Sequence, residues 1–118
     1  MGADGGRYAE LVAVEVVDRD GYARYRAAMA PILASHGGDF GIDFEIASVI
    51  RGPASFPPNR VFTIRFPDRA ARDRFFADVA YRAVRAAHFV PAVANVVTLA
   101  EFGETPGPGS PPWSVAIG

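Results

Sequence analysis

Two histidines, His36 and His88, are the side chains of this sequence best suited to acid–base chemistry near neutral pH. The chain has 118 residues, contains no cysteine and carries only arginine as its basic residue besides histidine. Proton transfer at pH 7 is therefore expected from these two imidazoles, or from a carboxylate or tyrosine whose pKa is shifted by its surroundings.

His88 follows Val84 by four residues and Tyr81 by seven, the spacing that places side chains on one side of an α-helix. On a continuous helix, His88 would act as a general base while Tyr81 orients the substrate or donates a proton. We therefore predict His88 and Tyr81 as catalytic residues. The alternative is a half-exposed histidine near a helix C-terminus, where the helix dipole stabilises it.

His36 stands directly before Gly37 and Gly38. We predict that it contributes to substrate binding, although a residue before a glycine C-cap is also an ordinary way for a helix to end. The spacing of the two histidines does not by itself make a metal site, because a set of two histidines and a carboxylate would have to assemble in three dimensions. No metal is predicted.

Glu15 and Arg65 are expected to form the polar end of a binding pocket. The strands that carry them are predicted to be neighbours, so both side chains would face an apolar interior, with Thr63 and Asn95 nearby. An acid and a guanidinium in such a place either pair with each other or bind a polar group of the substrate. If they pair, Glu15 stays ionised and is a poor base near pH 7. We predict Arg65, Glu15 and Asn95 as substrate-binding residues.

Aromatic side chains are expected to line or cover this pocket. Tyr22 and Tyr25 share the apolar face of the first helix, and their hydroxyl groups are predicted to reach the rim, so Tyr22 is a predicted substrate contact. Phe56, in a loop rich in glycine and proline, is a predicted lining or lid residue. Three further phenylalanines would join it: Phe75, Phe76 and Phe89. The alternative for all of them is a place in the core without a role in binding.

Six periodic segments must position these residues. Alternating apolar residues predict strands, and apolar residues at a spacing of three to four predict helices, with aspartates as N-caps. The segments are a strand at 8–17, a helix from Asp18 or Asp20 to His36 kinked at Pro31, a strand at 39–51 bulged at Gly41, a strand at 60–66, a helix from Asp68 that buries Ala71, Phe75 and Val79 and continues to Pro91, and a strand at 93–102. This order predicts an α+β, ferredoxin-like βαββαβ fold, in which both helices cover one face of a four-stranded antiparallel sheet.

The chain is long enough for one hydrophobic core and too short for two, which predicts a single domain. We expect a flexible N-terminus at 1–7, the folded domain at 8–103, and a tail rich in proline and glycine at 104–118. Trp113, Val115 and Ile117 alternate near the end of that tail. The tail is therefore expected to dock on a partner subunit or a sheet edge, and a loose tail is the alternative.

Composition excludes several classes of function. A net charge of −1 gives no electrostatic basis for binding nucleic acid or an anionic membrane. There is no apolar run long enough to span a bilayer and no signal pattern at the N-terminus, which predicts a cytoplasmic protein. The lack of cysteine excludes disulfides and thiolate catalysis. Neither of the glycine-rich phosphate-binding motifs is present, and no cofactor is predicted.

The face of the sheet opposite the helices is expected to be apolar. It would carry Leu11, Ala13, Val61, Val97 and Leu99 beside few polar groups. An exposed apolar patch of that size is unusual in a monomer. We therefore predict a homodimer in which two sheets pack face to face.

A set of short patterns resembles a known family. The patterns are Asp18-x-x-x-Tyr22-x-x-Tyr25, His36-Gly37-Gly38, and Arg65-Phe66-Pro67 leading to Tyr81-Arg82-Ala83. They resemble a family of uncharacterised small proteins in the dimeric α+β barrel superfamily, which also holds antibiotic-biosynthesis monooxygenases, polyketide cyclases and muconolactone isomerases. The resemblance covers about residues 8 to 102, and it places His88 where that family has an arginine.

The resemblance implies a homodimeric enzyme of secondary metabolism that needs no cofactor. It would use acid–base chemistry on a hydrophobic, aromatic or polyketide-like small molecule, with cyclisation, isomerisation and cofactor-free oxygenation as the compatible reactions. Two other readings of the sequence remain open. The chain is either a non-catalytic ligand-binding or stress-related homodimer with incidental histidines, or a structural dimer with a filled interior.

Overall fold

The structure is a computed structural model that describes residues 7–103. The predictions for the first six residues and for the tail at 104–118, including the docking of Trp113, Val115 and Ile117, lie outside the described residues.

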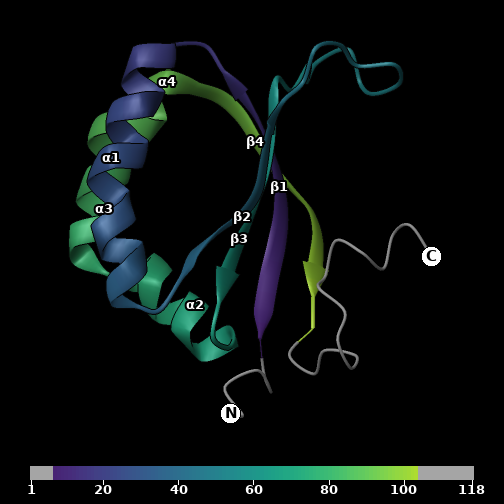
Figure 1. The fold of residues 1–118 in the computed structure, drawn as a ribbon. Helices are drawn as coiled ribbons and strands as arrows, with labels where there is room; N and C mark the ends of the chain where they lie inside the picture. The colour runs from purple at the N-terminus through teal and green to yellow at the C-terminus, as the bar shows by residue number, and fades with distance from the viewer. Residues whose placement is uncertain (1–6, 104–118) are drawn as a thin grey trace.

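Four strands and a group of helices follow one another in the predicted order (Figure 1). Their bounds are β1 (Tyr8–Val16), α1 (Arg19–Ser35), β2 (Asp39–Glu45), β3 (Arg60–Phe66), α2 (Arg69–Ala77), α3 (Val79–Val84), the π-helical turn η1 (Arg85–Phe89), α4 (Val90–Ala92) and β4 (Val93–Phe102). The strands form one antiparallel sheet in the order β2-β3-β1-β4, and all the helices lie on one face of it (Figure 1). The predicted ferredoxin-like α+β fold is confirmed.

The caps of α1 are the predicted ones. The Asp18 carboxylate accepts a hydrogen bond from the backbone N–H of Gly21 at 3.0 Å and so satisfies one of the free donors of the first turn. At the other end, Gly37 has a φ of 78°, a conformation that favours glycine. The helix continues through Pro31, which lies on its exposed side.

The second strand is shorter than predicted. β2 ends at Glu45, whereas the alternating pattern predicts a strand to residue 51. The partner strand β3 begins only at Arg60, which pairs with Glu45, so the residues after Glu45 have no strand to pair with. The predicted bulge at Gly41 is confirmed, because the β2–β3 register shifts between Phe40 and Asp43.

The second helical region is broken rather than continuous. Asp78 is extended, ends α2, and caps α3 by accepting a hydrogen bond from the backbone N–H of Ala80 at 2.8 Å. The prediction that Val79 is buried in line with Ala71 and Phe75 is therefore wrong, and Val79 is 83% exposed. Pro91 does not end the helical region, which continues to Ala92.

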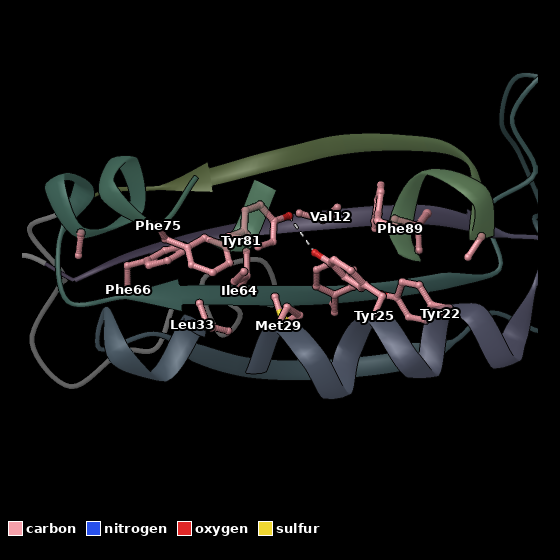
Figure 2. Packing of buried hydrophobic residues seen from close by; sticks show 14 of the residues in the cluster. Val12, Tyr22, Tyr25, Met29, Leu33, Ile64, Phe66, Phe75, Tyr81 and Phe89 are labelled. Atoms are coloured by element: carbon pink, nitrogen blue, oxygen red, sulfur yellow. Dashed lines mark hydrogen bonds between the residues drawn. The ribbon is translucent and has the colours of Figure 1, made fainter. Parts of the chain in front are cut away.

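The core lies between the helices and the sheet and is rich in aromatic rings (Figure 2). Tyr22, Met29 and Leu33 of α1, Val14 of β1 and Phe75 of α2 all belong to it, and their side chains are essentially inaccessible. One carboxylate, Glu10, is buried on the same side of the sheet. It accepts hydrogen bonds from the Tyr8 hydroxyl and from Arg72 Nε, each at 2.7 Å.

The opposite face of the sheet is not covered by any helix (Figure 1). Pairing places Ala13 beside Val61 and Val97, and Phe44 beside Val61, so apolar side chains gather there as predicted. Phe44, Val97 and Leu99 are large apolar residues that are exposed to solvent. Within residues 7–103, no helix has the length and apolarity needed to cross a bilayer.

Candidate functional site

The predicted catalytic residues His88 and Tyr81 differ in burial. Tyr81 is buried and packs on the Phe75 ring, with centroids 4.2 Å apart. The π-helical turn at 85–89 holds an extra residue per turn, so Phe89 takes the inward position and packs on Tyr25 with centroids 4.9 Å apart. The His88 side chain is half-buried and has no hydrogen-bond partner among residues 7–103. Its catalytic role stays a prediction.

The Tyr81 hydroxyl has a partner that the sequence does not reveal. It lies 2.9 Å from the Tyr25 hydroxyl, in the middle of the aromatic core (Figure 2). Burial raises the pKa of both phenols, so both stay protonated at neutral pH. The pair can donate hydrogen bonds but supplies no base.

His36 lies at the C-terminal end of α1, away from Tyr22 near the start of that helix. Its Nε2 is 2.8 Å from Asp78 Oδ2, and its ring packs edge-on against Phe75. The hydrogen bond with His36, followed by the backbone N–H of Ala80, holds the pKa of Asp78 below its usual value. This contact ties α1 to the junction of α2 and α3, and the predicted role of His36 in binding substrate stays untested.

The lowered pKa of Asp78 predicts a pH-dependent stabilisation. A carboxyl group whose pKa is lower in the folded state stabilises the fold above its unfolded pKa, about 3.9 for aspartate, and loses that contribution as the pH falls through the lower folded pKa. Replacing Asp78 with asparagine, which keeps an N-cap, should lower the free energy of unfolding more at pH 6 than at pH 2.5. Urea unfolding at both pH values measures this, with Asp20→Asn on the exposed side of α1 as the control. An equal loss at both pH values contradicts it.

The prediction that Glu15 and Arg65 lie together is wrong, and their roles in binding substrate stay predictions. The antiparallel register sets Arg65 opposite Ala9 on β1, so Glu15 lies six residues further along, about 20 Å away. Each side chain has another partner: Glu15 accepts a hydrogen bond from Asn95 at 2.8 Å, and Arg65 forms two hydrogen bonds with Asp39 at 2.8 and 2.7 Å. Both pairs lie on the face of the sheet opposite the helices.

Phe56 sits in the loop between β2 and β3, where its backbone N–H donates to the Pro53 carbonyl at 3.1 Å. Its side chain is half-buried and does not line the pocket described next. A role for Phe56 as a lid stays a prediction.

A pocket of about 320 Å³ opens between the start of α1 and the ends of β1, β2 and β3 near the long β2–β3 loop. It is lined by Val16, Arg19, Tyr22, Ala23, Arg26, Glu45, Asn59 and Arg60. Of the predicted site residues, Tyr22 alone lines it. At this end of the domain, the space between helix and sheet changes from an aromatic core to a charged cluster.

Arg26 and Arg60 share one carboxylate in this cluster. Arg60 donates to both oxygens of Asp43, with distances of 3.0 and 2.9 Å, and Arg26 Nη1 donates to Oδ2 at 3.1 Å. Burial alone would raise the pKa of Asp43, but the hydrogen bonds and charges of Arg60 and Arg26 outweigh burial and hold it below its usual value. Asp43 is therefore an anchor for the two arginines and a poor base.

Aromatic rings fix the Arg26 guanidinium. Its central carbon lies 3.9 Å from the centroid of Phe40 and 4.7 Å from that of Phe62, and Nε donates to the Tyr22 hydroxyl at 3.0 Å. Nη2 is buried without an acceptor among residues 7–103.

The Tyr22 hydroxyl accepts from Arg26 and keeps its own proton for another acceptor. Burial raises the pKa of Tyr22, while the charges of Arg26 and Arg60 oppose that rise, so the phenol is protonated at neutral pH. Across the pocket, Arg19 meets Glu45 at 3.3 Å in a pair whose side chains are 81% and 65% exposed. The arrangement offers one hydroxyl donor, guanidinium groups and one accessible carboxylate.

The Asn59 side chain lines the pocket and is itself hydrogen-bonded to the backbone. It accepts from the backbone N–H of Val16 and donates to the Val16 carbonyl, both at 2.8 Å, so its polar atoms hold the end of β1 in place. Between residues 7 and 103, no three histidine, aspartate or glutamate side chains come together as metal ligands would.

The arginines and carboxylates of the pocket escape prediction from sequence. A partial signal exists for Arg26, which follows Tyr22 by four residues and so shares its helix face. Asp43 and Arg60 lie on strands predicted to be consecutive, yet nothing in the pattern shows that their shared side of the sheet meets the first turns of α1.

Comparisons with known proteins give a family and a fold. The family model described as a domain of unknown function, DUF1330, matches residues 8–102. No curated protein matches this sequence significantly. A protein of unknown function from Rhodopseudomonas palustris has a similar structure, with a TM-score of 0.73, 19% identity, and coverage of 87% of this chain and 85% of that one.

Two other solved structures bear on the predicted superfamily. A DABB family protein with a ferredoxin-like fold from Mesorhizobium loti is 19% identical, with a TM-score of 0.60 and coverage of 86% of this chain and 98% of that one. A putative antibiotic biosynthesis monooxygenase from Nitrosomonas europaea is 16% identical, with a TM-score of 0.50 and coverage of 84% and 90%. The predicted relationship is confirmed for the fold, whereas Gly37-Gly38 and Tyr81 as a family signature stay a prediction.

Proposed function

Because this chain belongs to the DUF1330 family of domains of unknown function, we propose its activity from its own geometry: a cytoplasmic, homodimeric small-molecule enzyme that needs no cofactor. The substrate is hydrophobic, aromatic or polyketide-like, and the reaction is acid–base chemistry in the pocket at the start of α1. The observation that carries the proposal is a pocket of about 320 Å³ that joins Tyr22 to Arg26, Arg60 and Glu45. A cavity of about 150 Å³ accepts benzene, so this pocket has room for a substituted ring.

The mechanism begins with enolisation of a carbonyl compound. Glu45 takes a proton from the carbon beside the carbonyl, and the developing negative charge on the oxygen is stabilised by the Tyr22 hydroxyl and the guanidinium groups. The phenol, protonated at neutral pH, can complete the step by giving its proton to that oxygen. Cyclisation, isomerisation and reaction with oxygen all proceed from an enol or enolate, so one site serves each of the reactions that the resemblance implies.

The homodimer is supported by the uncovered face of the sheet. Phe44, Val97 and Leu99 expose apolar surface there, and two copies packed face to face would bury it. The pocket lies on the helix-covered side of the sheet, so this pairing leaves it open.

A second candidate site is the pair His88 and Tyr81. The observation in its favour is the π-helical turn that carries His88, since such turns recur at functional sites. In this version, His88 is the base and the Tyr25–Tyr81 hydroxyl pair is the donor. The two candidates differ in which variant loses activity.

The test is exchange of the α-protons of an aryl ketone, phenylacetone, for deuterium, followed by proton NMR with the full chain. We expect exchange above the buffer rate, and Tyr22→Phe should lower it about 100-fold, as expected for the loss of one donor to an oxyanion. Ala23→Trp, which fills the pocket from the exposed side of α1, should abolish it. Arg24→Ala, one residue further along and outside the pocket, serves as the matched control.

The other outcomes separate the alternatives. Loss of exchange in His88→Gln with full activity in Tyr22→Phe supports the second candidate. Binding of the ketone without exchange supports a non-catalytic ligand-binding domain. Neither binding nor exchange, with Ala23→Trp indistinguishable from the unaltered protein, overturns the proposed function.

A further inference from the structure

We infer that the ligand of this pocket is an organic monoanion, an aromatic or polyketide-like acid whose carboxylate binds at Arg26 and Arg19. The inference rests on the proposed function, because it names the substrate class of the same pocket. Four features of the pocket carry it: an unbalanced charge, a fixed guanidinium with a free donor, a replaceable partner at the mouth, and an apolar wall.

The charges around the pocket do not balance. Asp43 Oδ2 accepts hydrogen bonds from both Arg26 and Arg60, at 3.1 and 2.9 Å, so two guanidinium groups share a single carboxylate. The side chain of Arg26 is 17% exposed, that of Arg60 29% and that of Asp43 28%. This burial limits how far water can screen the remaining positive charge. Adding Arg19 and Glu45, which pair with each other, leaves one excess positive charge. A monoanionic ligand would neutralise it.

Arg26 is held in a fixed orientation with one donor group unused. The rings of Phe40 and Phe62 pack on the guanidinium. Its Nε donates to the Tyr22 hydroxyl, and its Nη1 donates to Asp43. Its Nη2 is buried and has no acceptor within residues 7–103. A buried donor without an acceptor is costly and adds to the unmet positive charge, and a ligand carboxylate would meet the 17% of the Arg26 side chain that is exposed at the pocket. A guanidinium that is already oriented also loses little freedom when it binds.

Arg19 supplies the second contact. Its pair with Glu45 is long and highly exposed, and such pairs contribute little, so a ligand carboxylate can replace Glu45 as the partner of Arg19. The exchange also frees the Glu45 carboxylate, the group proposed to take the proton. Binding of the acid and release of the base are then a single event at the mouth of the pocket.

The remaining wall suits an apolar body of limited size. Val16, Ala23 and the Tyr22 ring line it, and the volume of about 320 Å³ accommodates a substituted ring. A neutral ligand would leave the excess charge unmet. A dianion would reverse it and would meet Asp43 and Glu45.

The test uses acids and their amides, which match in shape and differ in charge: phenylacetate with phenylacetamide, and cinnamate with cinnamamide. Dissociation constants are measured with the full chain by NMR titration of backbone amides. Each acid should bind at least tenfold more tightly than its amide. Arg26→Met should remove that preference, and Arg24→Met, on the same helix but outside the pocket, should keep it. Because Arg26 packs on aromatic rings, the thermal melt of its variant is compared first with that of the unaltered protein.

If Arg26→Met is not folded, the exposed Arg19→Met variant gives the answer, with an expected weakening of acid binding of at least threefold and no change for the amides. Amides that bind as tightly as acids overturn the inference and leave the pocket and the proposed function standing. Shifts confined to residues outside the pocket, or none for any of the four compounds, overturn both.

Discussion

Replacing Arg72 with methionine should destabilise the domain by about 3 kcal/mol, because it leaves the Glu10 carboxylate buried without its cation. The Glu10 side chain is 4% exposed and that of Arg72 is 30% exposed, and Nε of Arg72 lies 2.7 Å from the carboxylate. The Tyr8 hydroxyl still donates to Glu10 at 2.7 Å, but a neutral donor cannot replace a guanidinium. Methionine keeps an apolar stem but removes the guanidinium, whose central carbon lies 4.7 Å from the Phe76 centroid, so the loss measured includes that cation–π contact beside the ion pair. Urea unfolding at pH 7 gives the free energy.

Two further variants show whether the buried charge is the cause. Adding Glu10→Gln to Arg72→Met removes the uncompensated carboxylate, so the double variant should be more stable than Arg72→Met alone. Arg69→Met breaks an exposed pair with Glu101, whose side chains are 49% exposed on both sides, and should cost less than about 1 kcal/mol. A double variant that is less stable than Arg72→Met by the full cost of Glu10→Gln would show that the two groups act independently.

The elements of the fold are predictable because local signals and side-chain periodicity agree. Asp18 and Asp68 are the expected caps, Gly37 has the positive φ that ends α1, and the antiparallel sheet follows from the order of the elements. Periodicity also places Glu15 and Arg65 on the same face of the sheet as Ala13. Periodicity does not show which residues of a face meet the helices. It also does not show the register, which separates Glu15 from Arg65 by six residues of β1.

The candidate site is harder to predict because it forms from tertiary contacts. Asp43 is on β2, Arg60 on β3 and Arg26 on α1, and they meet since the bulge after Phe40 sets the β2 register and the start of α1 lies over that corner of the sheet. The π-helical turn that buries Phe89 and leaves His88 half-buried has no signature in the apolar spacing. Asp78 is a partial exception, since an aspartate is a common N-cap and its place ahead of Val79 allows a break.

The two ends of the space between helices and sheet therefore have different roles. The ring centroids of Phe66, Phe76 and Tyr81 lie 4.2 to 5.7 Å from the ring centroid of Phe75. None of these residues lines the pocket. Around Arg26, charged groups leave a pocket open. A packed end that holds the helices on the sheet allows the other end to keep an unbalanced charge, whose cost is smaller than the stabilisation from the aromatic core.

Replacing Phe75 with alanine should lower the free energy of unfolding by about 3–5 kcal/mol, the usual cost of removing a fully buried phenylalanine. The ring is completely inaccessible and contacts residues of α3 and β3 as well as His36 at the end of α1, so the space left by it cannot be closed by one neighbour. Val79→Ala is the matched comparison, because the helical spacing predicts the same burial for both residues. With Val79 83% exposed, its loss should stay within about 0.5 kcal/mol.

Both variants are measured by urea unfolding at the same protein concentration, since dimerisation would make apparent stability depend on it. A large difference between them supports the break of the helix at Asp78. Similar losses of more than about 2 kcal/mol in both would mean that one continuous helix buries Phe75 and Val79 together, and the Asp78 cap would then be wrong. Ligand binding gives an independent reading: Phe75→Ala is remote from the pocket, so at a temperature where it remains folded its dissociation constants for the acids should match those of the unaltered protein.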